Sequence, residues 1–184
     1  MEGSTTYLAL DVHGLEYAPT HDANYLMRMI LTIIVAFLLQ GFVSGLLGDH
    51  LAPPDMVYLA ALLLAASASP YLGLPLAFAL GLLQDLLSAG YPGLHAVGLV
   101  CAAYAYYRLS RLVRWDELAG QAVILGGSFV AKWLGILLVA FWLRLGNFNP
   151  LTLWSVILPE MLLTLLVAPV VIRLYRHLFP LRSP

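Results

Sequence analysis

The chain has 184 residues, of which 61% are hydrophobic and 10% are charged. A soluble domain usually carries about 25% charged residues, so this composition excludes an ordinary water-soluble globular protein. Because a membrane-spanning helix needs about 20 apolar residues, the length allows at most about six to eight spans. We therefore expect an all-α, polytopic membrane helix bundle. The apolar segments are not flanked by a basic patch with interleaved aromatic residues, which argues against a nucleic-acid partner.

Residues 1–28 form a polar, mildly acidic segment that contains Gly14 and Pro19. The segment lacks the basic start and short apolar stretch of a signal peptide. We interpret it as a cytosolic tail or an engineered extension, separate from a transmembrane domain of residues 29–184.

The first apolar segment runs from Met29 to Gly48 and is long enough to cross a bilayer as a helix. Gly41 and Gly45 lie four residues apart within it. This small-xxx-small spacing lets a second helix approach closely, so the two glycines are candidates for packing against a partner helix.

Residues 49–55 have the composition of a water-facing turn followed by a helix start. The uncharged run of residues 56–84 would measure about 43 Å as one helix, well beyond a hydrocarbon core of about 30 Å. We therefore predict a break near its midpoint and two spans, roughly 56–69 and 72–88. The residues that favour this break are Ser67, Ser69, Pro70, Gly73 and Pro75.

Three further spans are predicted at residues 94–107, 118–144 and 151–172. The positive-inside bias places the basic loop of Arg108, Arg111 and Arg114, and the basic C-terminal tail, in the cytoplasm. Counting back, six spans put the N-terminus inside as well. If residues 56–84 were one kinked span, the count would be five and the N-terminus would lie outside. We interpret the basic loop as a topology determinant beside anionic lipid, with a cytoplasmic protein contact as the alternative.

Asp85 lies inside an apolar helix just before a turn, where a carboxylate is costly unless it is paired or hydrogen-bonded. It is expected to fix the hairpin by accepting hydrogen bonds from Ser88 or from the backbone amides of residues 90–95, and by pairing with His95. Gly93 belongs to the same turn. One histidine and one aspartate do not supply the three or four ligands of a zinc site, so no metal is expected.

Lys132 and Glu160 occupy the middles of two predicted adjacent antiparallel spans. An unpaired charge at the bilayer centre costs at least about 2.5 kcal/mol. We expect the two to form an intramembrane ion pair, the alternatives for Lys132 being Asp85 or a helix of a partner protein.

The sequence argues against an enzyme and indicates no cofactor. Ser128 follows two glycines, but neither it nor Ser44 matches a nucleophile elbow. A second mid-membrane aspartate for intramembrane proteolysis is missing, as are phosphate-binding and dinucleotide-binding loops. Cys101 is interpreted as a small buried hydrophobic residue.

The run from Gly81 to Ala96, GLLQDLLSAGYPGLHA, resembles the signature G-x-x-x-D-x-x-x-x-x-x-x-G-x-(H/N)-A of the rod shape-determining MreD family. Pro54-Asp55, the arginine-rich loop and Ala168-Pro169 are also similar to that family. The resemblance implies a six-helix protein of the bacterial inner membrane that binds the single-spanning MreC. It further implies work alongside MreB, RodA and the elongation transpeptidase in peptidoglycan synthesis, without catalysis. The family is similar in architecture to the S-components of energy-coupling vitamin transporters.

Two hypotheses follow. In the first, the chain is a scaffold of the elongation machinery, with MreC's membrane helix docking on the Gly41 and Gly45 face or on the Asp85 to His95 hairpin. In the second, it is an S-component-like small-molecule carrier, with convergent polar groups in a pocket. The polar residues available for such a pocket are Gln40, Asp85, His95, Lys132 and Glu160.

Overall fold

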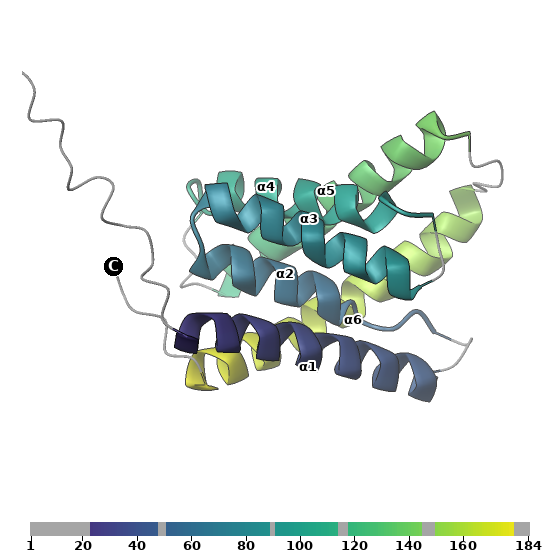
Figure 1. Ribbon diagram of the computed structural model, residues 1–184. Helices are drawn as coiled ribbons and strands as arrows, with labels where there is room; N and C mark the ends of the chain where they lie inside the picture. The colour runs from purple at the N-terminus through teal and green to yellow at the C-terminus, as the bar shows by residue number, and fades with distance from the viewer. Residues whose placement is uncertain (1–22, 48–50, 89–90, 114–117, 145–149, 179–184) are drawn as a thin grey trace, which may run out of the picture.

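The computed structural model describes residues 23–47, 51–88, 91–113, 118–144 and 150–178, and this part of the chain is all-helical (Figure 1). Its six helices are α1 (Ala23–Leu47), α2 (Met56–Ser67), α3 (Pro70–Leu87), α4 (Leu94–Leu109), α5 (Leu118–Trp142) and α6 (Pro150–Leu178). Among the described residues, four segments are long and apolar enough to cross a membrane: Leu26–Leu47, Pro70–Leu87, Ala119–Trp142 and Trp154–His177. The predicted class, a helical membrane bundle, is thus confirmed. Helices α2 and α4, with 12 and 16 residues, are shorter than these four segments.

The predicted break in the long apolar run lies between α2 and α3. Helix α2 ends at Ser67, and Pro70 opens α3, where a proline's missing N–H group costs no hydrogen bond. Pro75 lies inside α3 and does not contribute to the break. At the other end, α1 begins at Ala23 rather than Met29, so the last residues assigned to the polar tail are helical.

Helix α2 forms the centre of the bundle. Its residues from Met56 to Ala65 are all buried, and it is apolar around its whole circumference, as expected of a core helix. With 12 residues it rises about 18 Å, only part of a hydrocarbon core of about 30 Å. Helix α3 packs on α2 and α4, α4 packs closely on α5, and α1 and α6 flank α2 (Figure 1).

Small residues allow α4 and α5 to approach each other closely. A Cβ atom added to Gly135 would lie 2.8 Å from the Cys101 sulfur, so no larger residue fits there without a shift. Cys101 was expected to be a small buried residue, but it is only half-buried in this contact.

One end of the bundle collects the start of α1 and the ends of α2, α4 and α6. The Tyr107 hydroxyl donates a hydrogen bond to the Ala65 carbonyl at 2.9 Å, which joins the ends of α4 and α2. The Ser67 hydroxyl lies 3.5 Å from that of Tyr175, which adds the end of α6. In Figure 1 the starting turn of α1 and the last turns of α6 lie at this same end.

Candidate functional site

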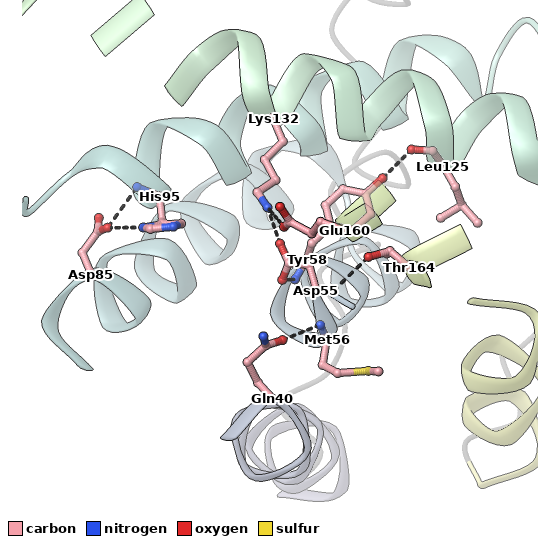
Figure 2. Close-up of polar contacts among 10 residues, drawn as sticks. All are labelled: Gln40, Asp55, Met56, Tyr58, Asp85, His95, Leu125, Lys132, Glu160 and Thr164. Atoms are coloured by element: carbon pink, nitrogen blue, oxygen red, sulfur yellow. Dashed lines mark hydrogen bonds and ion pairs between the residues drawn. The ribbon is translucent and has the colours of Figure 1, made fainter. Parts of the chain in front are cut away.

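A buried ion cluster joins three helices at the centre of the molecule. The Lys132 ammonium of α5 contacts the Asp55 carboxylate that precedes α2, and lies 2.8 Å from Glu160 Oε1 of α6 (Figure 2). The three side chains are only 3%, 4% and 13% exposed for Lys132, Asp55 and Glu160. The structure therefore brings Lys132 and Glu160 together and adds Asp55 as a second carboxylate. It does not bring Lys132 to Asp85, the alternative partner within the chain.

Asp55 also caps α2. Its Oδ1 accepts a hydrogen bond from the Tyr58 backbone N–H at 2.8 Å, while its own N–H donates to the Thr164 hydroxyl at 2.9 Å. The next N–H, of Met56, donates to the Gln40 side-chain oxygen at 2.7 Å. Because the free N–H groups at a helix start need acceptors when buried, α1 and α6 both contribute side chains to hold this end in place.

The surroundings of the cluster stabilise the charged forms of its side chains. Two carboxylates face one ammonium group, and the start of α2 adds a partial positive charge next to Asp55. The Lys132 nitrogen also lies 5.0 Å from the centre of the Phe129 ring and 5.3 Å from that of Trp133. Aromatic faces attract cations at such distances. The ammonium is thus enclosed by partners from its own chain, and we assign the cluster a role in joining helices.

The expectation that residues 49–55 form a water-facing turn is wrong for the end of that segment. Pro54 and Asp55 are buried, and only Leu51 is exposed among the described residues 51–55. The physical reason is that α2 starts inside the bundle, so the chain must enter the interior before the helix begins. The sequence held one signal of this burial. An aspartate directly before a long uncharged run is suited to cap a helix that has no polar face.

A second site holds α3 against the start of α4. The Asp85 carboxylate accepts hydrogen bonds from the backbone N–H groups of Gly93 at 2.8 Å, His95 at 3.0 Å and Ala96 at 3.2 Å. The His95 Nδ1 atom lies 2.7 Å from the same carboxylate (Figure 2). Gly93, with φ of 96°, is the N-cap of α4 and has no side chain to cap it. Asp85 supplies that cap from the neighbouring helix.

Of the two proposed sources of hydrogen bonds to Asp85, the backbone amides are the ones used. The Ser88 hydroxyl is 3.4 Å from the Asp85 backbone oxygen and donates there instead of to the carboxylate. Gly81 lies one turn before Asp85, and a Cβ atom at this position would lie 2.6 Å from Ala96 N. This spacing therefore has a structural role. Gly81 lets α3 approach α4 closely, and the Asp85 carboxylate joins the two helices by binding Gly93 and His95.

The other predicted site residues lie on the surface. Gly41 and Gly45 are exposed on α1, and an added Cβ at either would meet nothing within 4 Å. Arg108 and Arg111 are exposed at and after the end of α4, whereas Arg114 lies outside the described residues. Among the described residues, no group of three His, Cys, Asp or Glu side chains is placed to hold a metal ion.

The chain matches a known protein family over most of its length. Residues 20–178 match the family described as rod shape-determining protein MreD. No curated protein and no solved structure matches the chain. The matched range includes both the ion cluster and the Gly81 to Ala96 crossing, and the long apolar helices are those of a multi-pass membrane protein. The chain therefore belongs to the MreD family of bacterial membrane proteins, whose role is the determination of rod shape.

Proposed function

We propose that the protein is a non-catalytic scaffold of the cell-elongation machinery that binds the membrane helix of MreC and so supports peptidoglycan synthesis. The observation that carries the proposal is how the intramembrane charges are used. Lys132 is bonded to Asp55 and Glu160, and Asp85 to His95 and backbone amides. These charged side chains thus hold the protein's own helices together.

The proposed docking face is the outward side of α1 around Gly41 and Gly45. Both glycines are exposed, and they are flanked by Leu38 and Phe42, which are 67% and 68% exposed. A small-residue stripe between large apolar side chains is typical of a surface that receives another membrane helix. Within the complex, MreB, RodA and the elongation transpeptidase are the further proposed partners.

The proposed topology is six spans in the bacterial inner membrane with both termini in the cytoplasm. Its support is that Arg28, at the start of α1, lies at the same end of the bundle as Arg108 and Arg176, at the ends of α4 and α6. The positive-inside rule assigns such an end to the cytoplasm. Helix α2 then counts as a span that combines a short helix with the buried segment before it.

The alternative, an S-component-like carrier, requires convergent polar groups that a ligand can reach. The five candidate residues for such a pocket have partners inside the chain. Gln40 accepts from Met56, and the other four belong to the two buried sites. This pattern favours the scaffold.

The test is co-purification of MreC with the tagged protein from native membranes in mild detergent, followed by mass spectrometry. Stoichiometric MreC is expected with the wild type. The double variant Gly41→Leu/Gly45→Leu should lose MreC without a change in its own melting temperature, because neither position packs within the chain. Gly126→Leu is the matched control, since a Cβ there also meets nothing within 4 Å. Recovery of transport ATPase subunits instead of MreC would overturn the proposal.

A further inference from the structure

The two helices on one side of the bundle are short for an ordinary bilayer. Helix α4 carries no Asp, Glu, Lys or Arg from Leu94 to Tyr107, a stretch that rises about 21 Å. Its neighbour α3 has 18 residues and rises about 27 Å. The exposed surface of these two helices, which we call the α3–α4 face, is thus shorter than a hydrocarbon core of about 30 Å.

The helices on the other side are longer. Helix α5 has 25 residues and rises about 37 Å, and the apolar segment Trp154–His177 of α6 rises about 36 Å. A bilayer of ordinary thickness therefore fits α5 and α6, with some tilt, and exceeds the length of the α3–α4 face.

The two short helices are level with each other at both ends. At one end the Tyr107 hydroxyl of α4 donates to the Ser69 carbonyl, directly before α3, at 3.4 Å. At the other end the Asp85 carboxylate of α3 accepts from the Gly93 N–H group before α4 at 2.8 Å. Because these contacts fix one helix against the other, neither helix can slide along its axis to lengthen the face.

Exposed tyrosines mark both edges of the α3–α4 face. Tyr71, in the first turn of α3, is 90% exposed, and Tyr104 of α4 is 58% exposed at the same end. Tyr91, in the turn before α4, is 60% exposed at the opposite end. Tyrosines collect where hydrocarbon meets the lipid headgroups, because the ring is apolar and the hydroxyl group needs water. Arg108 is exposed one turn after Tyr104 and sets a charged limit to the apolar surface of α4.

We propose that the α3–α4 face binds a locally thinned bilayer, in which the acyl chains beside α3 and α4 span fewer ångströms than those beside α5 and α6. A membrane segment that is too short is accommodated by thinning of the bilayer, at a modest cost. The tyrosines at both edges favour lipid over a second protein as the occupant, since their hydroxyl groups then reach the headgroups.

This proposal is independent of MreC binding. In Figure 1, α3 and α4 lie on the side of α2 away from α1, the helix that carries Gly41 and Gly45. Thinning is therefore expected of the full-length protein alone in lipid vesicles. Failure of either proposal leaves the other standing.

The experiment measures the depth of a nitroxide label by electron paramagnetic resonance, from its accessibility to oxygen and to a water-soluble nickel chelate. In a Cys101→Ser background, Phe78→Cys places the label at the middle of α3, and Leu166→Cys is the matched position at the middle of the α6 segment. Both side chains are exposed. In dioleoylphosphatidylcholine vesicles the label at position 78 should lie about 3 Å shallower, half the difference between a face of about 24 Å and a core of about 30 Å.

Lipid length gives the second reading. When palmitoleoyl chains are replaced by erucoyl chains, the label at position 166 should move deeper, whereas the label at position 78 should keep its depth. Equal deepening at the two positions would overturn the proposal. So would a label at position 78 that is shielded from both oxygen and the chelate, since a second protein copy would then cover the face.

A matched pair of arginine variants tests what sets the length of the face. Arg108→Leu lengthens the apolar surface of α4 as far as Ser110, by about 4 Å, and should deepen the label at position 78 by about 2 Å. Arg173→Leu removes an exposed arginine from α6 and should leave that depth unchanged. An equal effect of the two variants, or none from Arg108→Leu, would contradict the proposed limit at α4.

Discussion

Lys132 is tolerated in the interior because two carboxylates from other helices meet its ammonium group. Removing one partner of a buried ion pair usually destabilises a protein strongly, since the remaining charge is left without compensation. Here the second carboxylate changes that expectation. Loss of Asp55 leaves Glu160 in contact with Lys132, and loss of Glu160 leaves Asp55.

The cluster should therefore respond to mutation in a non-additive way. Asp55→Asn, which keeps a helix cap, and Glu160→Gln should each lower the free energy of unfolding by about 1.5 kcal/mol. The double variant strips Lys132 of both carboxylates and should cost about 5 kcal/mol, more than the sum. Reversible unfolding in mixed detergent micelles measures these values. Arg111→Gln, an exposed change, should stay within about 0.5 kcal/mol, and strictly additive effects of the two variants would refute the shared cluster.

The sequence pointed to part of this cluster for a physical reason. Lys132 and Glu160 stand out because charges are rare inside apolar runs, and adjacent antiparallel helices place them at a similar depth. Asp55 lies at the edge of its apolar run, where an aspartate ordinarily faces water. Its contact with Lys132 spans 77 positions, and only the three-dimensional packing of α2 against α5 brings the two together.

At the scale of elements, the crossing of α3 and α4 depends on an N-terminal cap for α4 that a side chain of α3 supplies. Asp85→Ala would leave three N–H groups at the start of α4 without their acceptor in an apolar environment. The expected loss is about 3 kcal/mol of unfolding free energy. His95→Ala removes a single contact and should cost about 1 kcal/mol.

Ser88→Ala is the control for this crossing, because the Ser88 hydroxyl does not contact the carboxylate. It should change the stability by less than about 0.5 kcal/mol. The same micelle unfolding assay compares the three variants. An order in which Ser88→Ala costs more than Asp85→Ala would show that the hairpin is not held by the carboxylate.

Helix boundaries were predictable where a proline or glycine in the local sequence marks the helix start. Pro70 and the turn around Gly93 mark helix starts that follow from backbone chemistry alone. The interior position of the start of α2 was less accessible from sequence. Asp55 before the uncharged run indicates a helix cap, but only the hydrogen bonds that the Asp55 and Met56 N–H groups donate to Thr164 and Gln40 show that this helix start is buried.

At the scale of the whole molecule, the six-span and five-span topologies differ in the position of the N-terminus. In a Cys101→Ser background, Ser4→Cys and Arg111→Cys should react with a membrane-impermeant maleimide only after the cells are permeabilised. Tyr91→Cys, at an exposed position in the turn before α4, should react in intact spheroplasts. Labelling of Ser4→Cys in intact spheroplasts would favour five spans and contradict the proposed cytoplasmic N-terminus.

The cluster at the start of α2 also imposes an order on assembly. Asp55 is synthesised 77 residues before Lys132, and Glu160 follows 28 residues later. At about 5–20 residues per second, α2 waits roughly 5–20 s after leaving the ribosome before its last partner exists. Until α5 is made, the Asp55 carboxylate lacks its Lys132 counter-ion, and until α6 is made, the Asp55 N–H group lacks its Thr164 acceptor. The nascent chain therefore completes its core only when α6 arrives, and a chain terminated before Lys132 leaves the Asp55 carboxylate without its counter-ion.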